Sequence, residues 1–529
     1  MIHWVLCTIL LGNPISSPLQ EEPIQVPVGQ RQLFLDHGCI AQLQDLHSTM
    51  HQPVKRGAVI RPDAVSDGSR VQTYGSVPLW VPDEQVFKMV YMAFPMENHG
   101  EIGAALAISK DGLHWEKPDL GQGVSVRGST TNNRIFVDRK LHWGDNALWN
   151  VIYDADDPDP QRRFKGLLGA IGRTPVVSAD AIHWTQLVGT AIPSHDTSTL
   201  TYDDQNHRFL AVLKTFNRFG RAAALSTSPD FRIWSTPSPC FSTDDLDQKI
   251  AREVIRNRIH DRRFTVPLFV DPEPKTDAGP TTGRIPTWRA ECYAFSIFPY
   301  EGVYIGLPMV YYPTGEELPA RNNSDGFHSI QLAMSRDLTT WNRLGDRGEF
   351  IGPSPIDKGL IGVFDRQELI PPSRPVLRGD ELWFYYTGLK TRIPPYSRNS
   401  DGTARDPASL TDEERDDLAD GWSAICLAVL RRDGFVSLDA GPMPGTLLTK
   451  PFVLEAEKLC VNLDATAGEM TVEVLNNNQQ TVCCSKELPG NHPRTEVSWK
   501  SGHLAGLKGE TVRLRFTLTN SRLYSFWLE

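Results

Sequence analysis

A heptapeptide of the form S-x-D-x-x-x-W, which occurs four times, constrains the fold of this chain more than any other feature. The copies are Ser109–Trp115, Ser178–Trp184, Ser228–Trp234 and Ser335–Trp341, and a degenerate fifth lies at Arg431–Phe435. Each copy follows an apolar run with strand character, so the motif predicts a tight turn between two strands, with the Asp accepting hydrogen bonds from turn amides. The unequal spacing excludes a solenoid and favours a β-propeller, whose loops vary while each four-stranded blade stays fixed.

Paired β-rich runs before the motifs support a count of five blades. Turn-rich stretches such as 154–160 separate these runs, and helical periodicity is nearly absent apart from a short candidate helix at 411–418. After Gly445 the pattern changes to clean alternation of apolar and polar residues, which is typical of an antiparallel β-sandwich. The predicted fold is all-β: residues 20–54 lead in or close the ring, 55–444 form a five-bladed β-propeller, and 445–529 form a C-terminal β-sandwich.

Composition limits the functions to consider. The net charge of −10, spread without long runs of one sign, argues against a nucleic-acid partner, and no later stretch approaches the ~20 apolar residues that span a bilayer. Residues 1–19 resemble a signal peptide without basic residues, which predicts a secreted or periplasmic protein; the alternative is a buried N-terminal strand. The eight cysteines contain no C-x-x-C pair, so we predict no metal site and no cofactor. The oligomeric state is not indicated.

Acidic residues recur where the inner strand of each predicted blade begins, and in a propeller these positions face one mouth of the central channel. They are Asp67, Asp145, Asp196, Glu291 and Asp365, with Glu368 as a neighbour of the last. Glycoside hydrolysis needs two carboxylates beside the scissile bond, one as proton donor and one as nucleophile or base. A ring of acids from separate blades can supply that pair, although many acids before strands serve only as turn caps.

Other polar residues of the same segments are candidates for binding substrate. Arginine and histidine can orient sugar hydroxyls or anionic groups, and tryptophan can stack on a sugar face. The candidates are His195, Arg289, Arg366, His142 and Trp143. Each could equally be a structural partner of a neighbouring acid.

The turn motif resembles that of the five-bladed propellers of glycoside hydrolase families 32 and 43, in which the blades repeat S-x-D-G-x-x-W as in Ser109–Trp115. Several further segments resemble a group of hydrolase-like proteins of environmental bacteria: Leu33–Asp36, His51–Lys55, Arg61–Asp63, Thr449–Phe452, Leu514–Phe516 and Leu523–Phe526. The resemblance implies a catalytic Asp, an auxiliary Asp and a Glu acid at the channel mouth. Glu291-Cys292 is similar to the Glu-Cys pair of family 32, but it falls in the fourth predicted blade rather than the third, and two other motifs of that family are missing.

These observations lead to one main hypothesis and two alternatives. The main hypothesis is a glycoside hydrolase acting on a poly- or oligosaccharide, in which Glu291 is the general acid and Asp196 or Asp67 is the base or nucleophile. Asp145 and Asp365 would then tune pKa values or bind sugar hydroxyls. The alternatives are a non-catalytic carbohydrate-binding propeller and a glycoside phosphorylase, which needs Arg, Lys and His around a single acid.

Overall fold

The computed structural model describes residues 22–94, 102–137, 147–169, 171–189, 191–264, 268–274, 287–316, 324–357, 359–392 and 407–529. The chain divides into two compact units: one is Thr49–Ser437, and the other joins the residues before Thr49 to Leu438–Glu529. The predicted signal peptide at 1–19 lies outside the described residues, so export stays a prediction.

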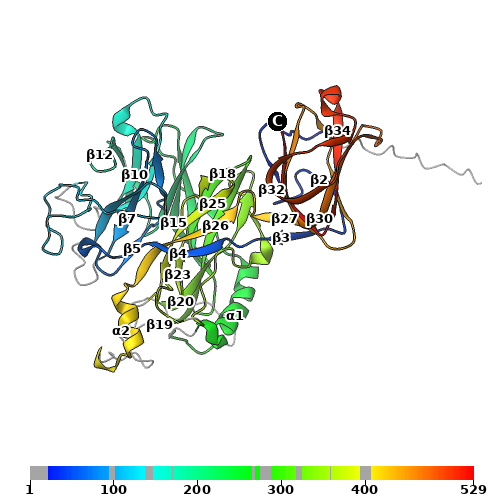
Figure 1. Cartoon of the computed structure of the whole chain (residues 1–529). Helices are drawn as coiled ribbons and strands as arrows, with labels where there is room; N and C mark the ends of the chain where they lie inside the picture. The colour runs from blue at the N-terminus through cyan, green and yellow to red at the C-terminus, as the bar shows by residue number, and fades with distance from the viewer. Residues whose placement is uncertain are drawn as a thin grey trace, which may run out of the picture. The chain divides into compact units, whose positions relative to one another are not determined.

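The unit Thr49–Ser437 is a five-bladed β-propeller, which confirms the predicted architecture; its sheets are drawn in Figure 1. The first blade holds β5 (Val71–Gln72), β6 (Leu79–Val81), β7 (Val86–Ala93) and β8 (Gly103–Ser109). The second holds β9 (Leu148–Tyr153), β10 (Phe164–Leu168), β11 (Gly172–Ser178), β12 (Trp184–Gln186) and β13 (Ile192–Pro193). The third holds β14 (Ser198–Asp203), β15 (Arg208–Asn217), β16 (Gly220–Ser228) and β17 (Ser238–Phe241).

The fourth and fifth blades complete the ring. The fourth holds β18 (Glu291–Tyr300), β19 (Val303–Glu316), β20 (Ser324–Ile330), β21 (Ala333–Ser335) and β22 (Asn342–Arg343). The fifth holds β23 (Glu368–Ile370), β24 (Val376–Arg378), β25 (Glu381–Leu389), β26 (Ser423–Arg431) and β4 (Val54–Ile60). Strand β4 pairs with β26, so an N-terminal strand supplies the outer edge of the last blade. The chain therefore leaves the propeller directly after β26, where the degenerate fifth turn motif stands.

The four complete turn motifs share one backbone conformation at their fourth residue. The φ angles of Gly112, Ala181, Phe231 and Leu338 are 78°, 70°, 62° and 66°. Only the first copy has glycine, which adopts this left-handed conformation without steric cost. In all four copies the Asp carboxylate accepts bonds from the two following turn amides at 2.7–2.9 Å, and these bonds hold the turn closed.

Two α-helices accompany the propeller, and Figure 1 shows both at the end of this unit where β19, β20 and β23 are labelled. Helix α2 (Asp412–Ala419), capped by Thr411, confirms the predicted helix. Helix α1 (Asp245–His260) was not predicted; Asp244 caps its first turn, and only Ala251 and Ile255 of its apolar side chains are buried. No helix of the described ranges has the length and apolar character to cross a bilayer.

The second unit is a curled antiparallel sheet of sandwich-like form around an apolar core that includes Leu463, Val472, Leu514, Phe516 and Phe526. Its strands from the C-terminal part are β27 (Val436–Ala440), β28 (Gly445–Thr449), β29 (Phe452–Val453), β30 (Leu459–Leu475), β31 (Thr481–Ser485), β32 (Leu488–Glu496), β33 (Trp499–Ser501), β34 (Thr511–Thr519) and β35 (Ser521–Leu528). The N-terminal strands β1 (Gln32–Leu33), β2 (Ile40–Gln44) and β3 (His47–Met50) join the same sheet. The seven cysteines within the described ranges of both units form no disulfide bond with one another.

Candidate functional site

The inner strands of the third and fourth blades run side by side in the same direction. Hydroxyls of Thr197, Thr199 and Thr201 donate to the carbonyls of Tyr293, Phe295 and Ile297 at 3.3, 2.9 and 2.8 Å. Since the contacts advance by two residues on both strands, β14 and β18 are parallel and begin at the same end. The segments before the inner strands, 64–70, 194–197, 288–291 and 365–368, are called the mouth below.

Asp196 is the most exposed of the described mouth acids, with 56% of its side chain accessible. Its Oδ1 lies 2.5 Å from Nζ of Lys214, and its Oδ2 accepts a 3.3 Å hydrogen bond from the hydroxyl of Tyr293. Burial works against ionisation, but the charges of Lys214 and Arg221 and the Tyr293 bond outweigh it and hold the pKa of Asp196 below its usual value. Asp196 is therefore an ionised carboxylate open to solvent, as a nucleophile or base must be.

Behind Asp196 lies a group of aromatic rings and cations, called here the aromatic–cation cluster. It consists of Tyr293, Tyr311, His328, Lys214, Arg221 and Arg392. Lys214 Nζ lies 3.7 Å from the ring centre of Tyr293, while Arg221 and Arg392 stand over the rings of both tyrosines at 4.7–5.5 Å. Stacking on the rings at these distances offsets part of the cost of burying the cations. The residues of this cluster come from three blades. Lys214 and Arg221 lie on β15 and β16, and Tyr293, Tyr311 and His328 lie on β18, β19 and β20. Arg392 follows β25.

Glu291 is almost fully buried between two arginines. Its Oε2 accepts 2.7 Å and 3.2 Å bonds from the guanidinium and the backbone amide of Arg221, and its Oε1 lies 3.4 Å from Nε of Arg289. A Cβ added at Gly220 would stand 2.4 Å from Arg289 and 2.6 Å from Glu291, so only glycine leaves room for this arrangement. Both carboxylate oxygens are engaged by cations, and the group holds Arg221 and Arg289 in place.

Glu368, at the start of β23, has fewer charged partners than Glu291. Its only ion pair among the described residues is with Arg392, at 3.6 Å. Glu368 and Asp196 both add to the rise in the pKa of Tyr74, which comes chiefly from burial, so both carboxylates lie near Tyr74. Tyr293 and Arg392 stand between them, because Tyr293 contacts Asp196 and Arg392 contacts Glu368.

The structure does not bring Asp67 to this group. Its side chain is fully buried, where it accepts a 2.7 Å bond from the Tyr91 hydroxyl and pairs with Lys117 at 2.6 Å. Neither partner contacts Asp196 or Glu291 within the described ranges. Asp67 also caps its own short helical turn by accepting from the amide of Ala64. These contacts describe a carboxylate that ties the segment before β5 to the first blade.

Asp365 and Arg366 make buried contacts within and beside the fifth blade. Asp365 pairs with Lys55 at 2.7 Å and accepts a 2.7 Å bond from Tyr386. Arg366 pairs with Asp417 of α2 at 2.6 Å, and both side chains are at most 1% exposed. These contacts, which for Asp365 all involve Oδ2, fasten β4 and α2 to this blade.

Two of the remaining predicted site residues border Asp196 and Glu291. Arg289 pairs with Glu291, and the exposed ring of His195 meets the ring of Phe216 edge-on at 4.9 Å. The backbone carbonyl of His195 accepts a 2.6 Å bond from Arg173, whose burial lowers its pKa to about 9. Asp145 and Trp143, with neighbouring His142, lie outside the described residues.

Sequence reasoning missed the cations and rings that surround Asp196. Lys214 follows the apolar run 209–213, and a lysine that ends a buried strand is a signal for a buried carboxylate partner. Arg221, Tyr293, His328 and Arg392 belong to no motif, and only the fold brings them together.

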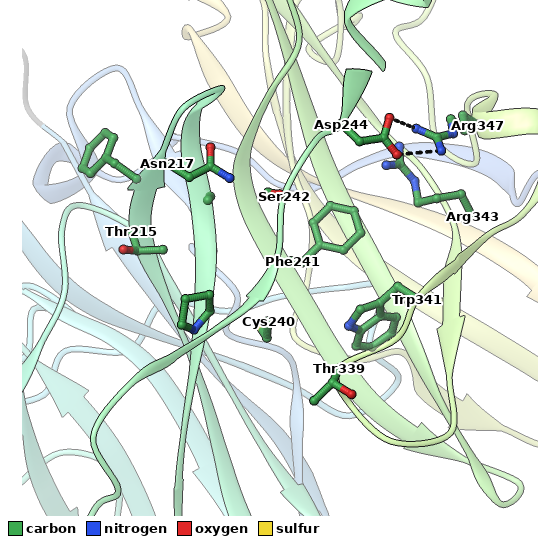
Figure 2. A pocket seen from close by; sticks show the side chains of 13 residues that line it. Thr215, Asn217, Cys240, Phe241, Ser242, Asp244, Thr339, Trp341, Arg343 and Arg347 are labelled. Carbon is green, nitrogen blue, oxygen red and sulfur yellow. Dashed lines mark hydrogen bonds and ion pairs between the residues drawn. The ribbon is translucent and has the colours of Figure 1, made fainter. Parts of the chain in front are cut away.

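A separate pocket lies between the third and fourth blades (Figure 2) and has a volume of about 350 Å³. At one end Asp244 and Arg347 form a two-bond ion pair at 2.7 and 2.9 Å. Phe241 and Trp341 meet edge to face at 6.5 Å, and the indole N–H of Trp341 has no hydrogen-bond partner among the described residues. The volume falls in the usual range of small-molecule sites, about 300–1,000 Å³.

Comparison with known proteins finds matches only among solved structures, at low sequence identity. No protein-family model matches the chain, and no curated protein matches it. Solved structures do match. An N-acetylgalactosamine deacetylase from F. plautii, in complex with blood group B trisaccharide, is 14% identical, with 74% of this chain and 97% of that chain covered and a TM-score of 0.42.

Two glycoside hydrolases of the families that the turn motif resembles are also found. A family 43 arabinoxylan arabinofuranohydrolase from Bacillus subtilis is 11% identical, covering 89% of this chain and 99% of that one, with a TM-score of 0.33. A family 32 β-fructofuranosidase from Bombyx mori is 9% identical, covering 90% and 93%, with a TM-score of 0.34. The architecture rests on the sheets described above, and no activity is carried over from these proteins.

Proposed function

We propose that this protein hydrolyses glycosidic bonds at the propeller mouth, with Asp196 as the ionised carboxylate of the reaction. The observation that carries the proposal is the setting of Asp196: it is open to solvent, paired with Lys214 at 2.5 Å and bonded by Tyr293. A carboxylate kept ionised and fixed in direction can bond to the anomeric carbon or take a proton from water.

Glu368 is the second carboxyl of the proposed pair. A proton donor must present an oxygen that is free to hold a proton, and two cations lie against Glu291: Arg221 is bonded to Oε2 at 2.7 Å, and Arg289 lies 3.4 Å from Oε1. Glu368 has one ion pair within the described ranges, at 3.6 Å from Arg392, and shares the surroundings of Tyr74 with Asp196. In the proposed reaction Glu368 gives its proton to the glycosidic oxygen as the bond to the anomeric carbon breaks, and water supplies the new hydroxyl.

The test is release of reducing ends from a panel of plant, algal and microbial glycans by the full chain. With an active substrate found, Asp196→Asn and Glu368→Gln are each expected to lower kcat/KM by about 10²–10⁴-fold, the usual contribution of a positioned acid or base. Asp230→Asn, in a turn motif, is the matched control and should keep full activity, because an amide oxygen still accepts the turn bonds. Full activity of Asp196→Asn would exclude the proposal.

The second candidate function is carbohydrate binding without cleavage, and the pocket of Figure 2 favours it. The rings of Phe241 and Trp341 can pack against the apolar face of a sugar ring, and the neighbouring Asp244–Arg347 pair can bond to its hydroxyls. Titration of glycans that the protein does not degrade tests this function. Asn217→Trp would fill the pocket from its β15 side and should abolish binding there, whereas Arg208→Gln, at the far end of β15, should leave binding unchanged. Binding that survives Asn217→Trp would exclude this pocket.

A further inference from the structure

The surroundings of Asp196 and Tyr293 are basic in a chain that is acidic overall. Around Asp196 and Tyr293 the basic side chains outnumber the acidic ones. The basic residues are Arg70, Arg173, Lys214, Arg221, Arg289 and Arg392. The acidic residues are Asp196, Glu291, Asp325 and Glu368. One of these acids carries charge only in part, because burial raises the pKa of Asp325 to about 6. The whole chain has a net charge of −10. A local excess of cations in such a chain is a feature of this site and not of the composition.

His328 stands at the centre of the aromatic–cation cluster without a polar partner. Its ring stacks on Tyr311 at 4.6 Å and meets Tyr293 edge-on at 5.0 Å, and the residue is fully buried. Neither ring nitrogen has a hydrogen-bond partner among the residues that the structure describes. A buried donor left unsatisfied costs stability, so its retention at this place calls for a ligand or another physical cause.

The charge state of His328 follows from its surroundings. Burial first, and then the charges of Arg392, Arg221 and Lys214, hold the pKa of His328 well below its usual value. The ring is therefore neutral and offers one N–H donor and one acceptor. An anion seated among the three cations would offset the local excess of positive charge and accept a hydrogen bond from the free N–H.

We propose that the aromatic–cation cluster is a subsite for an oxyanion, with Lys214, Arg221 and Arg392 supplying the charge and His328 supplying a neutral N–H. The oxyanion is either the carboxylate or sulfate of an acidic sugar unit or inorganic phosphate, and all of these share the chemistry that the cluster recognises. The inference rests on the proposed function, because the sugar held beside Asp196 is the one concerned. That sugar either carries the anionic group itself or is the sugar to which phosphate is transferred.

Binding by the full chain tests the subsite independently of turnover. The probes are a uronic-acid oligosaccharide, its carboxyl-reduced counterpart, inorganic phosphate and inorganic sulfate, each titrated calorimetrically at low and high salt. We expect at least one oxyanion to bind, the acidic oligosaccharide at least about tenfold more tightly than the reduced one if the anion belongs to the glycan, and the affinity to fall as salt rises. Absence of binding by every oxyanion would overturn the inference.

The variant that separates a ligand role from a structural one is His328→Phe. Phenylalanine keeps the stacked ring and removes both unpartnered nitrogens, so the unfolding midpoint should stay the same or rise. Oxyanion affinity should fall about tenfold or more, because the neutral N–H donor is lost. Arg208→Gln, which alters an ion pair with Asp203 away from the mouth, is the control and should change no affinity. Unchanged oxyanion affinity in His328→Phe would contradict the assignment of that residue.

Product analysis identifies the source of the anion and keeps the two proposals apart. If phosphate is the co-substrate, its oxygen replaces the glycosidic oxygen on the anomeric carbon, the leaving oxygen takes a proton, and a sugar phosphate accumulates. Oxyanion binding without cleavage of any glycan would refute the proposed function and leave the subsite standing. Equal cleavage of acidic and carboxyl-reduced glycans, with no oxyanion bound, would refute the subsite and leave the function standing.

Discussion

Carboxylates at the turn motifs and carboxylates at the mouth occupy opposite kinds of surroundings in the same propeller. At the turns, the partners of each Asp lie within three residues along the chain. Asp230, for instance, accepts from the amides of Arg232 and Ile233 at 2.8 and 2.9 Å. At the mouth, the partners of Asp196 come from β15 and β18, which are separated from it by up to 97 residues.

Both settings lower the pKa of the carboxyl, but by different means. The amides of Ile233 and Arg232 outweigh burial and lower the pKa of Asp230, whereas the charge of Lys214 does most of this work at Asp196. Backbone dipoles belong to the turn and close it, while a side-chain cation from a neighbouring strand can be shared with a ligand. The origin of the partners therefore separates acids that build the blades from acids available for chemistry.

The largest expected effect concerns Glu291, which lies at the mouth but is buried like a structural group. Glu291→Ala leaves the guanidiniums of Arg221 and Arg289 without their carboxylate, and we expect it to lower the free energy of unfolding by about 3–5 kcal/mol, as for other broken buried ion pairs. Urea unfolding of the full chain measures it. If the free energy of unfolding falls by less than about 1 kcal/mol, Glu291 is not a structural ion-pair partner and becomes a candidate for the proton donor again.

Sequence was sufficient for the blades because the turn motif is local. Its Ser, its Asp and its left-handed fourth residue interact within a few positions, so the pattern repeats wherever a blade does. From the sequence, residues 20–54 are expected to lead in or close the ring, but the strand that closes it, β4, could not be assigned locally, since Ile60 pairs with Ile425 through a contact that only the complete fold creates. Helix α1 was missed for a different reason: its apolar face is short, with Ala251 and Ile255 buried and Val254 and Ile259 partly buried, and charged residues separate them in the sequence.

The candidate site was predictable in place but not in detail. The geometry of a propeller puts the residues before the inner strands at one end, and this is why Asp196, Glu291 and the segment at 365–368 were selected from the sequence. Which of these acids is exposed depends on cations that are distant in sequence, as the pairing of Glu291 with Arg221 of the third blade shows. Such long-range pairing leaves no periodic trace in a single sequence.

A smaller effect is expected at the turns. Asp230→Ala removes the acceptor of two backbone amides, and loss of such a cap costs about 1 kcal/mol. Activity per folded molecule should be unchanged, because Asp230 contacts no residue of the mouth. Circular dichroism on heating measures the stability, and a glycan-release assay at a temperature where the variant is folded measures the activity. Reduced activity with the folded fraction intact would break the distinction between the two kinds of acid.

The smallest expected effect is on the stability of Asp196→Asn. Its dependence on pH and salt distinguishes a carboxylate paired with a charged side chain from one bonded to backbone amides. Asp196 has a folded pKa below the ordinary value of 3.8, so its contribution to stability is present above about pH 4 and is lost as the pH falls through the lowered value. Because the side chain is half exposed, Asp196→Asn should cost less than about 1 kcal/mol at pH 7, and this cost should shrink below pH 4.

Salt should also reduce the cost at Asp196, since a full charge on Lys214 is screened, whereas the cost of Asp230→Ala should change less because its partners are dipoles. Urea unfolding of both variants at pH 3 and pH 7, with and without 1 M salt, makes the comparison. Equal salt dependence would mean that Lys214 is not the partner that fixes Asp196. The basis for assigning Asp196 to the reaction and Asp230 to the framework would then be lost.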